Sequence, residues 1–214
     1  MPSRPAPPPT RIFVARHGQT VSNREGLFCG HSETPLTGTG RDQARALALR
    51  LREIPIHAAY ASDFSRARDT ASAVLEGRSL PLVEDPALRE LHYGQWEMEK
   101  ERLIARRYPQ QFRLMRAEDP SWRPPGGEDI QAVRARTYAA LRAIARRHPH
   151  QNTLIVSHGT AINCMLSAVL GMPASHTFRF AVDNCGLSEV TVRGGRLCLS
   201  LLNDTSHLQR PPPP

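Results

Sequence analysis

Short apolar runs alternate with longer amphipathic segments along the chain. Five runs have the length of a buried strand: residues 12–15, 58–61, 153–156, 187–192 and 197–202. The segments between them carry apolar residues at helical spacing, which predicts helices over residues 37–51, 64–75, 97–116, 128–147 and 159–170. This alternation is typical of a layered α/β fold with a mostly parallel sheet.

Residues that start or stop elements support these boundaries. Thr37, in the stretch PLTGTG, is a suitable N-cap for the first long helix. Pro109 predicts a break inside the helix expected over residues 97–116. Gly194 and Gly195 join the last two runs, which therefore predict a hairpin at an edge of the sheet.

The chain has the length of one domain and shows no internal repeat. Its 214 residues are enough to bury a sizeable core. Proline-rich ends predict extended tails over residues 1–10 and 207–214, on either side of a domain over residues 11–206. A proline-rich ligand for a partner domain is the alternative interpretation of these tails.

Charge and composition narrow the classes of function. The formal charge is +8, and residues 100–150 contain twelve basic and five acidic residues. This excess indicates either a field that attracts an anionic substrate or a solvated helical face. Only 6% of residues are aromatic, and no base-stacking pattern accompanies the charge, so we expect no nucleic-acid partner.

Other features concern the compartment and the state of the thiols. No apolar run is long enough for a membrane span, and the N-terminus has no apolar signal core, so we expect a cytoplasmic protein without a membrane partner. The cysteines, Cys29, Cys164, Cys185 and Cys198, show no CxxC spacing, which favours reduced thiols over a disulfide framework or a zinc site. Whether the protein forms a homodimer is left open.

Chemically reactive residues follow three of the predicted strands. Arg16 and His17 follow the first strand, Arg66 lies just beyond the second, and His158 and Gly159 follow the third. In open α/β sheets, ligands bind outside the carboxyl ends of the strands. We therefore expect two histidines and two arginines to share one pocket.

This set of residues favours phosphoryl transfer over acyl transfer or metal-dependent hydrolysis. Arginine offers phosphate oxygens a planar, permanently charged fork of donors, and histidine can be nucleophile, acid or base near neutral pH. Gly159 at a helix start would leave backbone N–H groups for an anion. Adjacent arginines repel cations, so we expect no metal. The alternative is that each histidine only satisfies local backbone groups.

Six blocks, in order, resemble the histidine phosphatase superfamily, also called phosphoglycerate mutase-like: ARHGQTVSN, TPLTGTGRDQA, SDFSRARDTA, LRELHYGQWE, PGGED and VSHGT. The resemblance covers roughly residues 11–192. It implies a three-layer α/β/α sandwich with a mostly parallel central sheet. It also implies phosphoryl transfer through a phosphohistidine, for which we expect neither a metal nor a cofactor.

The resemblance implies roles for particular residues. His17 would be the nucleophile that accepts the phosphoryl group, and Arg16, Arg66 and His158 would surround the phosphate oxygens. Glu90 would be the general acid that protonates the leaving oxygen. The substrate would also contact residues around this centre, namely Asn23, Cys29, Gly30, Tyr93 and Gly159.

The chemistry places conditions on these residues. His17 must be neutral to attack, and two nearby arginines lower its pKa. We expect its other nitrogen to donate to a backbone carbonyl, which would fix the tautomer. Gly18 has no side chain to obstruct the phosphoryl group. Glu90 must hold a proton when it acts, and a nearby phosphate dianion favours that form.

Within the superfamily, the compact region after Glu90 favours a phosphatase for a small phosphorylated metabolite over a phosphoglycerate mutase. Arg106 and Arg107 could serve a mutase or form only a basic helical stripe. The stretches GLFCGHSETPLT, YGQWEM and LGMPASHTFRF resemble the α-ribazole-5′-phosphate phosphatases of cobalamin biosynthesis. Met98 replaces the glycine that is usual in the family. A third alternative is a non-catalytic module that binds phosphorylated ligands.

Overall fold

The central sheet has six strands, and the computed structural model describes residues 7–119 and 121–209. The strands are β1 (Thr10–Arg16), β2 (Ala58–Ala61), β3 (Leu82–Glu84), β4 (Asn152–Ser157), β5 (Leu187–Arg193) and β6 (Arg196–Asp204). Their spatial order is β3-β2-β4-β1-β5-β6. The first three neighbouring pairs are parallel, and β1–β5 and β5–β6 are antiparallel. The predicted mostly parallel sheet is confirmed.

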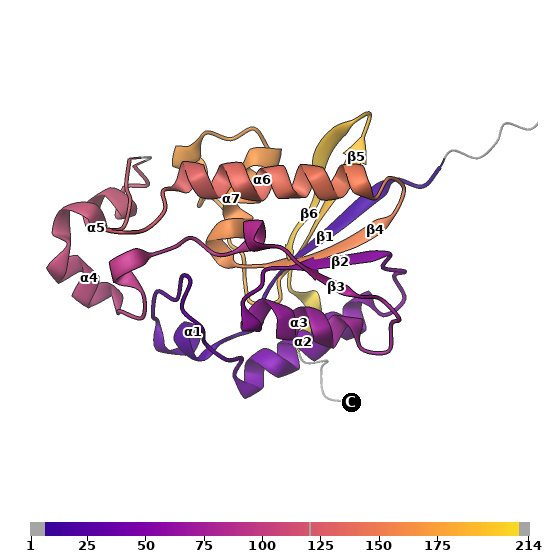
Figure 1. The fold of residues 1–214 in the computed structure, drawn as a ribbon, viewed down its shortest axis with the longest axis horizontal. Helices are drawn as coiled ribbons and strands as arrows, with labels where there is room; N and C mark the ends of the chain where they lie inside the picture. Colours follow the sequence, from indigo (N-terminus) through magenta and orange to yellow (C-terminus); the bar gives the residue numbers. More distant parts are fainter. Residues whose placement is uncertain (1–6, 120, 210–214) are drawn as a thin grey trace, which may run out of the picture.

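Helices pack on both faces of this sheet (Figure 1). The helices of the described residues are α1 (Val21–Glu25), α2 (Gly38–Leu51), α3 (Ser65–Leu75), α4 (Glu101–Arg107), α5 (Pro109–Arg116), α6 (Ile130–Arg147) and α7 (Gly159–Val169). Helices α2 and α3 cover one face, and α6 and α7 cover the other. These layers form the predicted α/β/α sandwich.

The side chains of β1 show how both faces are filled. Phe13 and Ala15 belong to the core on the side of α2 and α3, and Ile12 and Val14 to the core on the side of α6 and α7. All four are at most 2% exposed. Successive strand residues point to opposite faces, so a strand between two helical layers has to be apolar throughout.

Most predicted elements are present, with differences at their ends. The Thr37 hydroxyl caps α2 by accepting the N–H of Gly40 at 3.0 Å. Strands β5 and β6 form the predicted edge hairpin. The break predicted near Pro109 is confirmed, since α4 ends at Arg107 and α5 begins at Pro109, but the predicted start at residue 97 is wrong because α4 begins only at Glu101. Proline has no N–H with which to continue the preceding helix.

The sequence pattern does not predict α1 or β3, and it starts α6 too early. Helix α1 has five residues and is held by a capping box between Thr20 and Asn23. Strand β3 has three residues, two of them exposed, so it lacks an apolar run. Helix α6 begins at Ile130, because the side chain of Asp129 caps its first turn.

A third apolar cluster joins α4 and α5 to the ends of α6 and α7. At its centre, Trp96 and Trp122 stack with ring centroids 5.7 Å apart and an interplanar angle of 5°. Leu91 is fully buried in the same cluster. The chain on either side of Leu91 is therefore anchored to the helical layer that contains α6 and α7.

The predicted tails lie only partly within the described residues, since residues 1–6 and 210–214 are outside them. Thr10 opens β1, and the turn Ser206–Leu208 packs Leu208 against the core beside α2. The packed structure therefore extends by a residue or two beyond the limits 11–206. The assignment of the outer residues as tails stays a prediction.

The thiols and the helices bear on two further predictions. All four cysteines are free, and Cys164 and Cys185 are buried. Within residues 7–119 and 121–209, no helix has both the length and the apolar character to cross a membrane.

Candidate active site

The predicted residues converge at the carboxyl ends of three parallel strands. Arg16, the last residue of β1, is in register with Ser157, the last residue of β4. His17 and His158 therefore leave the sheet side by side, with ring centroids 5.1 Å apart. Arg66 comes from the first turn of α3, which follows β2. Parallel strands bring these residues together because their carboxyl ends share one edge of the sheet.

A cavity of about 360 Å³ opens at this edge. Every predicted site residue lines it except His158, whose side chain is fully buried beside His17. The predicted residues on its walls are Arg16, His17, Asn23, Cys29, Gly30, Arg66, Glu90, Tyr93 and Gly159. The structure thus assembles the whole predicted set in one place.

His17 is held as a neutral ring with one nitrogen free. Its Nδ1 lies 2.8 Å from the carbonyl oxygen of Gly18, which can only accept, so Nδ1 carries the proton and Nε2 the lone pair. The predicted backbone partner is confirmed. Burial lowers the pKa of His17 well below 6.5, and the charges of Arg16 and Arg66 lower it further.

Arg66 fixes the tautomer of His158. Its Nε–H donates to Nδ1 of His158 at 3.1 Å, so the proton of the neutral imidazole is on Nε2. Burial and the charge of Arg66 lower the pKa of His158 well below 6.5. The Nε2–H group is buried and has no hydrogen-bond partner among the described residues.

Arg66 is a fully buried cation, and Arg16 is a partly buried one on the cavity wall. Arg66 is 1% exposed, and two more of its N–H groups donate to the carbonyls of Gly30 and Ser32 at 2.7 and 2.9 Å. Arg16 donates to the Val182 carbonyl at 2.7 Å, and its buried Nε has no partner within the described part of the chain. No carboxylate there forms an ion pair with either arginine. Two such cations strongly favour an anion in the cavity.

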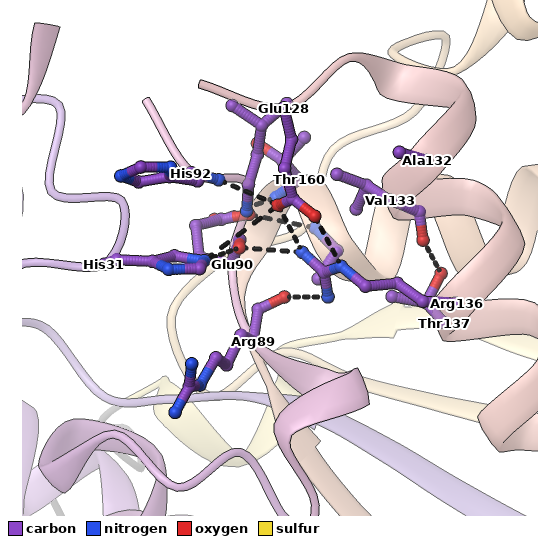
Figure 2. A network of polar contacts seen from close by, with 12 residues as sticks. His31, Arg89, Glu90, His92, Glu128, Ala132, Val133, Arg136, Thr137 and Thr160 are labelled. Atoms are coloured by element: carbon purple, nitrogen blue, oxygen red, sulfur yellow. Dashed lines mark hydrogen bonds and ion pairs between the residues drawn. The ribbon is translucent and has the colours of Figure 1, made fainter. Parts of the chain in front are cut away.

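Glu90 occupies the helix start that the sequence analysis assigned to an external anion. Its carboxylate accepts the backbone N–H groups of Leu91 at 2.8 Å and of Thr160 and Ala161 at 3.1 Å each (Figure 2). The prediction that Gly159 leaves these N–H groups free is therefore wrong. A carboxylate from the same chain satisfies the first turn of α7.

Gly18 has a different role from the expected one. A Cβ there would not point into the cavity but against the backbone of Gly40 in α2, 3.0 Å from its carbonyl carbon and closer to its oxygen. A Cβ on Gly40 would in turn meet the backbone of Gln19. The two glycines let the loop after β1 touch the start of α2. The expectation that Gly18 clears a path for the phosphoryl group is corrected accordingly.

The predicted substrate contacts differ in how they are held. Tyr93 shares a hydrogen bond of 3.0 Å with the hydroxyl of Thr160, and burial raises its pKa. Gly30 has φ 54°, and a side chain there would collide with the carboxylate of Glu97. Met98 also has a positive φ, 59°, which explains why glycine suits that position.

Sequence reasoning missed several residues on the cavity walls: Leu27, Phe28, Thr160, Asn163, Phe178 and Val182. Asn163 lies four residues after Gly159, on the same face of α7, so helical spacing could have found it. Phe178 and Val182 come from the irregular segment before β5; Phe178 stands in the stretch LGMPASHTFRF, but no helical or strand periodicity marks either residue. Asn184, which donates to the His17 carbonyl at 2.9 Å, was also missed.

Across residues 7–119 and 121–209, no group of three or more His, Cys, Asp or Glu side chains is arranged to hold a metal ion. The positive charge next to His17 comes from arginine side chains.

The fold and the cavity together define a class of protein. A neutral imidazole, two arginine cations and a carboxylate, gathered at the carboxyl edge of an α/β/α sandwich, are the components of a site for phosphoryl groups. Residues 12–205 match the sequence profile of the histidine phosphatase superfamily (branch 1), and the chain belongs to this superfamily. The resemblance stated from the six blocks is confirmed.

Individual relatives carry two kinds of name. The adenosylcobalamin/alpha-ribazole phosphatase of Salmonella typhimurium is 34% identical over 193 residues, covering 90% of this chain and 96% of that protein. The "Probable phosphoglycerate mutase GpmB" of Cronobacter sakazakii is 32% identical over 206 residues, covering 94% and 96%. Among solved structures, Bacillus stearothermophilus YhfR matches with a TM-score of 0.90 and 31% identity, covering 94% of this chain and 100% of that one.

Proposed function

We propose that the protein is a metal-independent phosphomonoesterase that works through a phosphohistidine at His17. The state of His17 carries this proposal: Nδ1–H donates to a carbonyl, so the lone pair of Nε2 is available, and the ring is neutral. Arg16 and Arg66 supply the positive charge that the transferring group needs, and the neutral ring of His158 supplies an N–H donor.

The reaction has two steps. In the first, His17 Nε2 attacks phosphorus, the bond between phosphorus and the ester oxygen breaks, and Glu90 gives its proton to the leaving alcohol. In the second, water attacks the phosphohistidine, the P–N bond breaks, and Glu90 takes a proton from that water. The products are the alcohol and inorganic phosphate, and both side chains return to their starting states.

An uncharged leaving group suits this cavity best. Among the described residues on its walls, Arg16, Arg66 and Glu90 are the charged side chains. Both arginines serve the phosphoryl group, so no further cation is left for the carboxylate of a phosphoglycerate. Arg106 and Arg107 are not on the walls, and Arg107 forms a surface ion pair instead. This composition favours a phosphatase over a mutase.

The apolar walls support an aromatic alcohol as the finer assignment. Phe28, Tyr93 and Phe178 line the cavity together with Leu27 and Val182. Such surfaces bind an uncharged ring by burying it. With the named relative from Salmonella, this favours α-ribazole-5′-phosphate, the phosphate ester of an aromatic riboside, as the substrate.

The central test is hydrolysis of p-nitrophenyl phosphate in the presence of EDTA. We expect wild-type activity with EDTA and its loss in His17→Ala. His57→Ala is the matched control, because His57 precedes β2 at the opposite end of the sheet, and it should retain full activity. Mass spectrometry of base-quenched enzyme should find phosphate on the peptide that contains His17. Tight phosphate binding without turnover would instead support a binding module.

A substrate panel tests the finer assignment. We expect kcat/KM for α-ribazole-5′-phosphate to exceed that for 3-phosphoglycerate and for sugar phosphates. Interconversion of 2- and 3-phosphoglycerate, without release of phosphate, would refute the phosphatase assignment and support a mutase.

A further inference from the structure

The segment that carries Glu90 has no regular secondary structure of its own. It connects the short turns Pro86–Leu88 and Gly94–Trp96, and residues 89–93 form neither helix nor strand. An acid that protonates a leaving oxygen has to be held in place, and Glu90 is not held by the backbone hydrogen bonds of a helix or a strand. The position of Glu90 therefore depends on contacts from other segments.

Arg136, on α6, supplies several of these contacts (Figure 2). Its guanidinium donates to the carbonyl oxygens of Ala87, Arg89 and Glu90 at 3.0, 2.6 and 2.8 Å. Two further N–H groups donate to the carboxylate of Glu128 at 3.0 and 2.9 Å. Arginine has five N–H donors in a rigid fork, so all of them are used in this one arrangement.

Glu128 extends the same contacts past Glu90. Its carboxylate accepts the backbone N–H of His92 at 3.0 Å, and its own N–H donates to the His92 carbonyl at 2.9 Å. Arg136 and Glu128, which we call the acid-loop clamp, thus hold the main chain on both sides of Glu90. Their side chains are 21% and 26% exposed, so these bonds lie largely out of water, where they are stronger.

The acid-loop clamp binds the main chain of Glu90 and not its carboxylate. The carboxylate is held separately by the N–H groups of Thr160 and Ala161 at the start of α7. Neither Arg136 nor Glu128 is among the described residues that line the cavity. Helix α6 therefore fixes the main chain of Glu90, and α7 fixes its carboxylate.

We propose that Arg136, supported by Glu128, is a positioning residue for proton donation by Glu90. It sets the place of the acid relative to the leaving oxygen and touches no substrate. This inference rests on the proposed function, in which Glu90 protonates the leaving group. The competing account, in which the clamp only stabilises the fold, predicts equal losses of activity for all substrates.

The dependence of the rate on the leaving group separates the two accounts. p-Nitrophenolate leaves readily without a proton, whereas an alkoxide needs one. The measurement is kcat/KM for glycerol 2-phosphate and for p-nitrophenyl phosphate, because kcat/KM includes departure of the leaving group. The value for glycerol 2-phosphate divided by the value for p-nitrophenyl phosphate is a ratio that does not depend on the concentration of folded enzyme. A variant that folds poorly therefore still gives an answer.

Two substitutions of Arg136 are informative: Arg136→Lys keeps the charge without the fork, and Arg136→Gln removes both. We expect each to lower the ratio by about 10- to 100-fold, and we expect the same of Glu90→Gln, because the benefit of the acid is lost. Arg134→Lys is the matched control. Arg134 lies on the same helix but donates to Ser167 and Met172, so its ratio should equal that of the wild type.

Each alternative outcome has a definite meaning. A normal ratio in both Arg136 variants, beside a lowered ratio in Glu90→Gln, would overturn the positioning role. An equal fall in Arg134→Lys would also overturn it, because general damage to α6 would then explain the effect. A normal ratio in Glu90→Gln would refute the acid role and this proposal with it. Wild-type protein that hydrolyses neither ester would refute the proposed function itself.

Discussion

Replacing Gly18 with alanine would place a methyl group against the main chain of α2. The new Cβ would lie 3.0 Å from the carbonyl carbon of Gly40 and closer to its oxygen, whereas ordinary contacts begin at 3.4 Å. The obstacle is backbone, which cannot rotate away as a flexible side chain can. The N–H of Gly18 is also bound to the Thr70 hydroxyl at 3.0 Å, and the N–H of His17 to the Ser157 carbonyl at 3.0 Å.

The size of the effect follows from this geometry. The loop and the helix must separate by about 0.5–1 Å, and such overpacking costs about 1–3 kcal/mol in the free energy of unfolding. The residue that moves with the loop is His17. A displacement of about 1 Å at the reacting atoms lowers kcat by about 100-fold. We therefore expect both stability and kcat to fall.

Urea unfolding and p-nitrophenyl phosphate hydrolysis measure the two effects. Gly38→Ala is the matched control, because Gly38 lies in α2 beside Gly40 and a Cβ on Gly38 meets nothing within 4 Å. It should keep wild-type kcat and stability to within about 1 kcal/mol. If Gly18→Ala raised KM and left the free energy of unfolding unchanged, the glycine would serve the substrate path and our steric argument would be refuted.

Three further predictions concern stability and reactivity. Burial holds the pKa values of His17 and His158 well below 6.5, so the unfolded chain binds more protons and the free energy of unfolding falls as the pH drops below about 6.5. In urea unfolding near pH 5–6, His17→Gln should reduce the dependence of this free energy on pH by up to ~1.4 kcal/mol per pH unit, and an unchanged dependence would contradict the argument. Burial raises the pKa of the Cys164 and Cys185 thiols to about 12, so a thiol-specific disulfide reagent near pH 8 should modify both only after unfolding. Met98, at φ 59° and 43% exposed, should tolerate Met98→Gly with wild-type activity and a gain of up to about 1 kcal/mol in thermal or urea unfolding, whereas a loss of stability would show that its side chain contributes packing.

The fold was largely predictable because its strongest signals are local. Buried strands have apolar runs in their sequence, and the helices that cover the two faces of the sheet have amphipathic spacing between these runs. The elements that were missed are those with weak local signals. Strand β3 has three residues and is partly exposed, and its place at the sheet edge comes from pairing with β2. Helix α1 has five residues and is defined by its capping box rather than by periodicity.

The reactive residues of the candidate site were predictable, whereas much of the cavity wall around them was not. Arg16, His17 and His158 stand at the ends of apolar runs, and the edge rule for parallel sheets brings such residues together. Resemblance to the superfamily added Glu90 and the proposed covalent step. Phe178 and Val182 were not predictable, because they reach the cavity from a segment with no periodic pattern.

The sequence by itself determined the alternation of elements, the sheet between two helical layers and a pocket rich in arginine and histidine. The tertiary structure alone decided that Gly18 serves the packing of two backbone segments, that Glu90 satisfies the start of α7, and that Arg136 holds the acid loop. Each of these is a contact between segments far apart along the chain. A close approach of two backbones, or a hydrogen bond to a main-chain carbonyl, produces no periodic pattern in the sequence of either segment. Such contacts can therefore be identified only from the three-dimensional structure.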